Sequence, residues 1–283
     1  MLHIAMKLTS HQYGKQRVRV MKIIRDGNTQ TVKELTIGVA LQGDFETSYT
    51  AGDNSLVVAT DTMKNTVQAL AKDHLGTDTE KFLAYLGHHF VSKYPQVKTA
   101  TISSKEHVWQ RLTIGGAPHP HSFSGNDSST PFSEITVTAA GGSAFSGIDN
   151  WLLLKSTGSS FVDYPRCEFT TLPETTDRVL ATSIKATWKW TGELDNYATA
   201  NEAIVSAMLV PFSNNHSPSA QTTLFEMGAA ALAACPNISE IHIVMPNKHY
   251  ILVPLDKFGL ENNNDIFLPI DEPHGQIEAT VSR

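Results

Sequence analysis

Two segments of the sequence show the same succession of signals, and they constrain the fold more than any other feature. Residues 93–102 read KYPQVKTATI and residues 234–243 read ACPNISEIHI. Each segment ends a helical pattern, breaks it with a proline and starts an alternating strand. A shorter echo places VVAT at residues 57–60 and VLAT at residues 179–182. We therefore expect one supersecondary unit used twice.

The first half of the chain predicts antiparallel strands with two helices between them. Alternating or β-rich runs predict strands, amphipathic periodicity predicts helices, and Asp26-Gly27-Asn28 is typical of a hairpin turn. The expected strands are 17–24, 31–41, 97–104, 107–114 and 133–139, and the expected helices are 63–73 and 79–94.

The second half repeats this order. Expected strands are 151–156, 183–190, 238–245 and 249–254, with helices at 200–212 and 218–234. The glycine-rich stretch GGSAFSG, at residues 141–147, is the best boundary, which gives domains at 10–140 and 148–283. The predicted class is α+β, with paired helices on one face of an antiparallel sheet. Nothing in the sequence supplies a second helical layer. We therefore expect one face to curve into a barrel whose interior is filled by the sheet itself or by its neighbours, which suggests self-association.

Composition narrows the class of partner. A formal net charge of −6 argues against nucleic-acid binding, which needs clustered Lys and Arg. Cys167 and Cys235 are far apart and predict two free thiols in a reducing compartment. The start of the chain lacks a signal-peptide core, no run of 18 apolar residues predicts a membrane span, and the end, VSR, is not a peroxisomal tripeptide. We expect a cytoplasmic protein.

Common motifs for nucleotide binding and for a catalytic serine are missing from the sequence. It contains no GxGxxG, no GxxxxGK[ST] and no GxSxG. His119-Pro-His121 is the most metal-like feature, with His107, His88 and His89 nearby, but a third ligand at suitable spacing is missing. We expect no bound metal, and expect His119 and His121 to stiffen a loop.

Four short segments have a composition that suits chemistry. They are Gln12-Tyr13-Gly14-Lys15, Val58-Ala59-Thr60-Asp61, residues 169–174 with Arg178 following, and Pro246-Asn247-Lys248-His249, which we expect to join two strands. Each also has a structural interpretation. Thr60 or Asp61 could cap the helix expected from Met63, Lys15 and Lys248 could be surface charges, Arg178 an ion-pair partner and His249 a strand histidine.

Taken together, these segments resemble the uricase (urate oxidase) family. The matching blocks are YGK followed by VRV, TAGDNSLVVATDTMKNT, LLKSTGSSF, FTTLPETTDR, SPSAQTTLFEMG and MPNKHY, in family order over almost the whole chain. The resemblance implies two tandem tunnelling-fold (T-fold) units per chain, which assemble into a tunnel-shaped barrel. It also implies a homotetramer with active sites at subunit interfaces.

The resemblance also implies roles for individual residues. Arg178 and Gln221 would grip the edge of urate, with Ala220 adding a backbone N–H, Phe161 stacking on the purine and Leu172 forming an apolar wall. Thr60 and Asp61 would come from the neighbouring subunit and contact the other end of the ring. Lys15, Thr60 and His249 would form a proton relay. Asn247, together with Thr60, would hold oxygen and then peroxide over the ring.

The implied reaction is the oxidation of urate by O2 to 5-hydroxyisourate and H2O2 without metal or organic cofactor. Positioning, electrostatics and proton transfer would suffice, because deprotonated urate is itself electron-rich.

Three positions in two regions depart from the family pattern. Ala220 stands where a bulky Val is usual, which removes packing, and Cys167 and Phe169 replace polar residues in the entrance loop. The alternative function is a T-fold purine- or pterin-binding protein, or a related hydrolase, without oxidase activity.

Overall fold

The computed structural model describes residues 6–126 and 128–283, and these divide into two compact units. Unit 1 comprises the chain up to Ser146 together with Gly192–Ala198, and unit 2 comprises Gly147–Thr191 and Thr199–Arg283. The start of the chain, on which the expectation of no signal peptide partly rests, lies outside the described residues. Among those described, no helix has both the length and the apolar character needed to cross a membrane.

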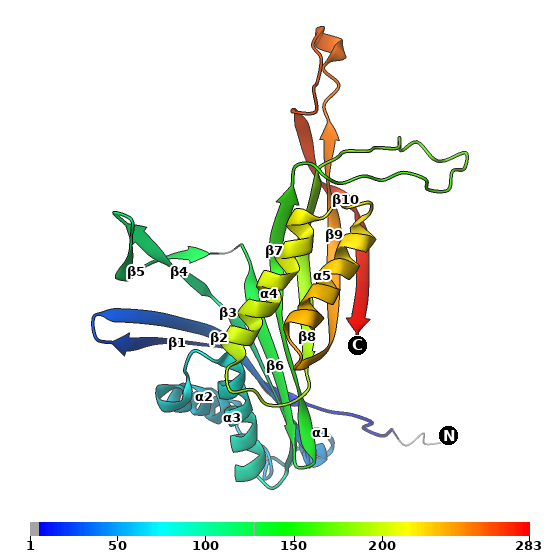
Figure 1. Ribbon diagram of the computed structural model, residues 1–283. Helices are drawn as coiled ribbons and strands as arrows, with labels where there is room; N and C mark the ends of the chain where they lie inside the picture. Colours follow the sequence, from blue (N-terminus) through cyan, green and yellow to red (C-terminus); the bar gives the residue numbers. More distant parts are fainter. Residues whose placement is uncertain (1–5, 127) are drawn as a thin grey trace, which may run out of the picture. The chain divides into compact units, whose positions relative to one another are not determined.

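Unit 1 is an antiparallel sheet with helices packed on one face (Figure 1). Its strands follow the order β1-β2-β3-β6-β7, with β4 and β5 forming a separate two-stranded sheet. The elements are β1 (Tyr13–Asp26), β2 (Thr29–Gly43), α1 (Glu46–Thr50), α2 (Thr60–His74), α3 (Thr79–Lys93), β3 (Val97–Glu106), β4 (Val108–Ile114), β5 (Ala117–Asn126), β6 (Thr130–Thr138) and the first part of β7 (Gly141–Lys155).

Unit 2 repeats this plan with fewer strands. Helices α4 and α5 lie side by side across the strands of the sheet, which are ordered β7-β8-β9-β10 (Figure 1). Its elements are the rest of β7, β8 (Leu180–Trp190), α4 (Tyr197–Asn214), α5 (Ala220–Ala234), β9 (Ile238–Leu252), the short helix η1 (Asp256–Phe258) and β10 (Phe267–Ser282).

In both units the core lies between the sheet and its helices. Alternate residues of β2 are fully buried against α2 and α3, and they include Leu35, Ile37, Val39 and Leu41. In unit 2, alternate residues of β8 and β9 are buried in the same way, and they include Ile184, Ala186, Trp188, Ile241 and Ile243. This spacing of two is what the alternating sequence patterns predict for strands with one covered face.

Two glycines 141 residues apart support the duplication. Gly87 in α3 lies so close to the sheet that a Cβ atom would come within 2.6 Å of Val137, and Gly228 in α5 is in the same situation, 2.7 Å from Val281. Each of the two helices therefore approaches its sheet at a residue without a side chain. The longer sequence repeat occupies equivalent places as well, since both copies end a helix and begin a strand. The shorter echo does not, because VVAT precedes α2 whereas VLAT enters β8.

The structure corrects several expected elements. The glycine-rich stretch, expected to be the boundary, contains the point at which the two units divide, and it forms the beginning of strand β7. His119 and His121 lie in strand β5, which pairs with β4, and not in a loop. Residues 238–252 form one continuous strand, so Pro246–His249 does not join two strands, and β10 was not predicted at all. The polar and proline-containing sequences of β5 and β10 hide their strand character, which comes from pairing with a neighbouring strand.

Candidate functional site

A β-bulge determines the direction of Lys15 on β1. The pairing with β2 shifts between Lys15 and Val18, and Arg17, within the shift, has a φ of 61°. Lys15 is opposite Val39 and Val18 is opposite Ile37, and both partners are fully buried on the helix side of the sheet. In a regular strand, residues three positions apart point to opposite faces. The additional residue in the bulge changes this, so Lys15 and Val18 both point to the helix-covered face. Lys15 is half-buried there.

Thr60 and Asp61 are the first two residues of α2. The capping position, just before the first helical residue, is occupied by Ala59, which makes no side-chain capping bond. The interpretation of Thr60 or Asp61 as the helix cap is therefore wrong, because both lie within the helix. Both residues are exposed. The first N–H groups of a helix have no partner within it, so this helix start offers backbone donors to a ligand.

Tyr13 connects the strand that bears Lys15 to the segment that leads into Thr60. Its hydroxyl accepts the N–H of Val58 at 2.8 Å and donates to the Val58 carbonyl oxygen at 3.2 Å. The pKa of Asp61 is lowered by its bond with Lys64, by a bond from Asn65 and also by the positive charge of Lys15. Lys15 and the start of α2 are therefore electrostatic neighbours. We name Lys15, Thr60 and Asp61 the proton-relay half-site, after the role that the family resemblance implies for Lys15 and Thr60.

In unit 2, a network of backbone bonds holds Phe161 and Arg178 together. Phe161 exchanges two backbone hydrogen bonds with Thr175, at 2.8 and 3.1 Å, and the N–H of Arg178 donates to the Ser159 carbonyl at 2.8 Å. The Arg178 guanidinium carbon lies 5.3 Å from the centre of the Phe161 ring, and Nε donates to Ser159 Oγ at 3.4 Å. Burial lowers the pKa of Arg178 from its strongly basic ordinary value.

Ser217 joins this network to the start of α5. Its backbone accepts from Ser160 and donates to Gly158, each at 2.8 Å, and its hydroxyl accepts from Thr223 at 2.6 Å. Ser159 and Ser217 are both almost fully buried. No sequence motif marks Ser159 or Ser217 as functional, and only their occurrence in the short serine-rich segments GSS and SPS indicates them.

Helix α5 begins with Ala220 and Gln221. Ser219 caps the helix by accepting the Thr222 N–H at 3.1 Å. Ala220 is buried, whereas Gln221 is exposed and extends from the first turn. The backbone bonds through Ser217 therefore bring Gln221 into the region of Arg178 and Phe161.

Asn247 and His249 continue the core-facing side of β9. Ile241, Ile243 and Met245 are fully buried, and Asn247 and His249 are the next two residues of the same alternation, both half-buried. The chain therefore changes from apolar to polar along one face of the strand. The partner strand β10 shifts register opposite this point, between Ile270 and Gly275. On the other face, Lys248 is paired with Asp271 at 2.8 Å.

The loop between Phe161 and Arg178 has several internal bonds. Tyr164 stacks on Phe161, with ring centres 4.8 Å apart, and its hydroxyl donates to the Leu172 carbonyl at 2.5 Å. Leu172 itself is 55% exposed, so its side chain is not covered within this unit. The N–H of Cys167 donates to Thr170 Oγ1 at 2.9 Å, and a hydrogen bond from the Phe169 backbone lowers the pKa of the Cys167 thiol. Two of the residues that depart from the family pattern, Cys167 and Phe169, thus lie in a hydrogen-bonded turn.

The predicted site residues consequently form two groups. The proton-relay half-site belongs to unit 1. The second group, which we call the substrate half-site, belongs to unit 2 and comprises Phe161, Leu172, Arg178, Ala220, Gln221, Asn247 and His249. Each group includes the first two residues of a helix, which are Thr60 and Asp61 of α2 in unit 1 and Ala220 and Gln221 of α5 in unit 2.

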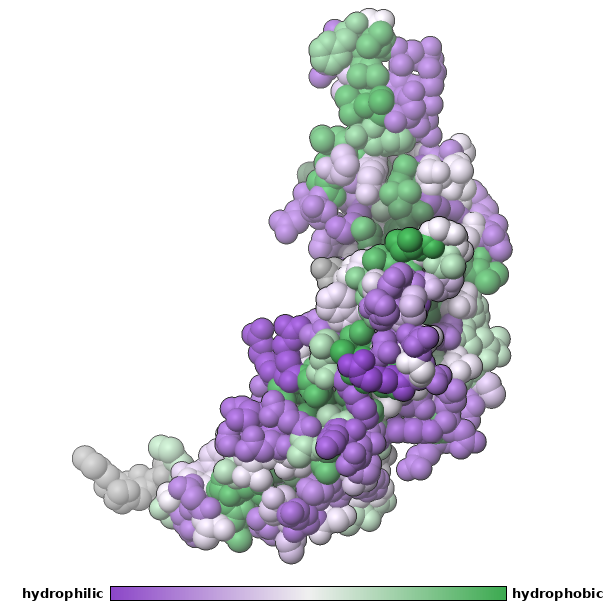
Figure 2. All heavy atoms as spheres, turned by 90° about the vertical axis from the view of Figure 1, so that its left-hand side faces the viewer, coloured by the Kyte–Doolittle hydropathy of each residue, from purple (hydrophilic) through white to green (hydrophobic). Residues whose placement is uncertain are grey.

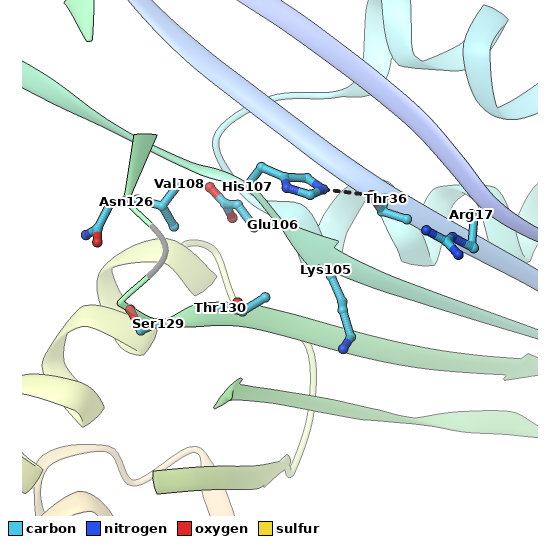
Figure 3. A pocket seen from close by; sticks show the side chains of 9 residues that line it. All are labelled: Arg17, Thr36, Lys105, Glu106, His107, Val108, Asn126, Ser129 and Thr130. Atoms are coloured by element: carbon cyan, nitrogen blue, oxygen red, sulfur yellow. Dashed lines mark hydrogen bonds between the residues drawn. The ribbon is translucent and has the colours of Figure 1, made fainter. Parts of the chain in front are cut away.

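A cleft of about 540 Å³ lies elsewhere in unit 1 (Figure 3). His107 bonds to Thr36 there at 2.8 Å, and none of the lining residues is a predicted site residue. The described residues contain no cluster of three or more His, Cys, Asp or Glu side chains that could hold a metal ion. His119 instead accepts the backbone N–H of His121 at 3.4 Å.

The fold and the two groups define a class: an α+β protein with a half-buried arginine beside an aromatic ring in one unit and a lysine near a helix start in the other. Comparisons with known proteins are consistent with this class. The uricase family model matches residues 11–136 and 144–278. The chain is 40% identical to the uricase of Arthrobacter globiformis, over 98% of this chain and 90% of the relative. It is 38% identical to the uricase of Aspergillus flavus, over 96% and 95%.

Solved structures show the same fold. The crystal structure of the Arthrobacter globiformis uricase superposes with a TM-score of 0.93 at 39% identity, over 99% of this chain and 96% of that one. A uricase structure from Bacillus fastidious gives 0.85 at 27% identity, over 96% and 94%. The chain belongs to the uricase family.

Proposed function

We propose that this member of the uricase family binds urate with its substrate half-site and oxidises it with molecular oxygen. As a uricase, the chain is an oxidoreductase that acts on urate. The observation that carries the proposal is the arrangement of Arg178, held by Ser159 against the ring of Phe161 beside the start of α5. Urate is a flat anion with carbonyl oxygens and N–H groups along its edge. A guanidinium fork reads such an edge with two parallel bonds, while an aromatic ring stacks on its face.

Gln221 and Ala220 complete the grip on the purine in this proposal. The Gln221 carboxamide offers both a donor and an acceptor, and the first turn of α5 offers backbone N–H groups. Tyr164 packs against Phe161 and keeps the stacking ring in place. Leu172 covers the purine from the side once it is bound.

The proton-relay half-site provides the acid–base chemistry. Lys15 takes a proton from urate through the Thr60 hydroxyl, which can donate and accept, and His249 extends the path. The backbone N–H groups of Thr60 and Asp61 contact the far end of the purine. The bonds between Tyr13 and Val58 support this role, because they fix the strand of Lys15 against the segment before Thr60.

The electrons come from the substrate itself. Deprotonated urate passes two electrons to O2, one at a time, while Asn247 and Thr60 hold the oxygen over the ring. Water then adds to the oxidised purine, and the balance is urate, O2 and water to 5-hydroxyisourate and H2O2. No metal or organic cofactor is required in this scheme.

The two half-sites belong to different subunits in this proposal. Each chain consists of two tandem T-fold units, an interpretation that Gly87 and Gly228 support through their equivalent helix–sheet contacts. The chains associate as a homotetramer around a tunnel, so that Lys15, Thr60 and Asp61 of one subunit face Arg178 of its neighbour.

The test is an assay of urate loss and peroxide formation, in metal-free buffer with a chelator. We expect wild-type activity there, Lys15→Met to lower kcat by about 100-fold or more, and binding of a purine analogue to be retained, because a general base contributes about 10²–10⁴-fold. Lys22→Met, on the same strand, is the matched control and should behave as wild type. Loss of activity on chelation would refute the cofactor-free reaction. Purine binding without oxygen consumption would indicate a binding protein instead.

A further inference from the structure

Thr182 lies directly beside Asn247 in the sheet. The pairing of β8 with β9 places Thr182 opposite Asn247, and the register is unbroken from there to Lys185 opposite Val244. On β8, the buried residues Ile184, Ala186 and Trp188 alternate on the helix-covered face, and Thr182 is the preceding position of that alternation. Asn247 follows Met245 on the same face of β9. The two side chains are therefore neighbours on one face, with Cβ atoms about 5 Å apart.

The hydroxyl of Thr182 is fully buried and lacks a partner. The residue has 0% exposure, and among the described residues Oγ1 contacts no hydrogen-bonding atom. A buried hydroxyl without a bond is costly and uncommon, so its presence calls for a function.

We propose that Thr182 is a positioning residue that orients the carboxamide of Asn247 for oxygen. Its Oγ1–H donates to Asn247 Oδ1 when substrate is bound. This inference rests on the proposed function, in which Asn247 holds oxygen over the ring.

The hydrogen-bond inventory of the two side chains gives the physical reason. A carboxamide has an acceptor end and a donor end, and its neighbours decide which end faces the ligand. With Oδ1 turned toward the Thr182 hydroxyl, the Asn247 NH2 group faces the oxygen site. Superoxide and peroxide are electron-rich and need donors, so the opposite orientation would repel the species that form during the reaction.

The decisive variant is Thr182→Val, which keeps the shape of the side chain and removes the hydroxyl. We expect kcat to fall about tenfold, as for loss of one hydrogen bond, and KM for O2 to rise, while KM for urate changes less than about twofold. Thermal unfolding should stay at or above that of wild type, because a buried hydroxyl without a partner is replaced by a methyl group. Thr182→Ser should restore kcat. Thr187→Val, on the other face of β8, is the matched control and should match wild type.

Combining each variant with Asn247→Ala separates this inference from the proposed function. If Thr182 acts through Asn247, Thr182→Val will cause no further loss of kcat in the Asn247→Ala background. An equal loss in both backgrounds would overturn the inference. The inference would also be overturned if Thr182→Val had the kcat of wild type while Asn247→Ala alone lowered kcat. In that case the proposed function would stand. If Asn247→Ala itself retains wild-type kcat and KM for O2, the proposed role of Asn247 fails.

Discussion

The guanidinium of Arg178 combines three properties that a lysine lacks. It stacks near the Phe161 ring, keeps one N–H for Ser159, and still presents a planar fork to a ligand. An ammonium group is a point donor on a flexible stem, so it can replace the charge but not the two parallel bonds.

Arg178→Lys is therefore expected to weaken substrate binding more than turnover. KM for urate should rise about 10- to 100-fold, with kcat within about threefold of wild type, since the loss is of binding shared by substrate and transition state. Steady-state kinetics and titration with a purine analogue measure the two effects. Arg25→Lys, at the exposed end of β1, is the control. A fall in kcat at unchanged KM would assign Arg178 to the chemical step.

Glu34 is a buried carboxylate whose charge stabilises unit 1. It accepts from the Trp109 indole at 2.8 Å and is paired with Arg19. The Trp109 hydrogen bond is the main cause of a lowered pKa, helped by the charge of Arg19. Because the folded pKa lies below the ordinary value of 4.5, the stabilisation is complete above that value. It is lost as the pH falls through the lowered folded pKa.

We expect Glu34→Gln to cost about 1–3 kcal/mol of unfolding free energy at neutral pH, as for hydrogen bonds to a charged group. The difference from wild type should begin to shrink near pH 4.5 and disappear at more acidic pH. Denaturant unfolding between pH 3 and 7 would measure it, with the exposed Glu261→Gln as control. A difference that does not vary with pH would show that the charge of Glu34 is unimportant.

At the scale of elements, the close approach of α3 and α5 to their sheets depends on glycine. An alanine normally stabilises a helix by about 0.5–1 kcal/mol relative to glycine. At Gly228, however, a Cβ atom would meet the Val281 side chain at 2.7 Å, and at Gly87 it would meet Val137 at 2.6 Å. Valine is short and stiff, so the helix or the strand must shift.

Gly228→Ala and Gly87→Ala should therefore each destabilise the protein, by about 1–3 kcal/mol, despite the better helix propensity. Gly76→Ala is the matched control, since nothing lies within 4 Å of its Cβ position. It should be neutral or slightly stabilising. Equal stabilisation of all three variants in thermal unfolding would refute the proposed helix–sheet contact.

At the scale of the whole molecule, unit 2 exposes many apolar side chains at the ends of β9 and β10. Hydrophobic atoms are visible at the top of Figure 2, where this hairpin lies. The exposed side chains are Ile251, Leu252, Phe258, Leu260, Ile266 and Leu268. A contiguous apolar surface of this kind is typical of a subunit interface, in agreement with the proposed tetramer.

A mixture of two inactive variants tests whether the site spans two subunits. Lys15→Met disables the proton-relay half-site and Arg178→Gln disables the substrate half-site. When the two chains are coexpressed in equal amounts, about a quarter of sites between subunits combine two intact halves. We expect that fraction of wild-type turnover, against almost none for either variant alone. If the site lay within one chain, every site would keep one defect and no activity would return.

Sequence patterns alone were enough to identify the family and most of the regular elements, and they led to the prediction of which residues bear the chemistry. Alternation, amphipathic periodicity and the repeat at residues 93–102 and 234–243 predicted the long helices α2, α3, α4 and α5 and most of the strands, because these patterns reflect local burial. The short helices α1 and η1 were not predicted. The uricase family was evident from its motifs and is confirmed by the family match. Strands β5 and β10 were not predicted, since their sequences are polar and they are strands only because they pair with a neighbouring strand.

The direction in which the predicted site residues face depends instead on contacts between distant segments. Strict alternation back from Val18 would put Gln16 on the helix face, and the bulge at Arg17 gives that place to Lys15. The sequence predicts that Asn247 lies in a connection between two strands. In the structure β9 is unbroken, and Asn247 is a polar residue that follows the buried residues on one face of this strand, opposite Thr182. Local patterns do not encode either result, because a bulge and a cross-strand register depend on partners distant in the chain.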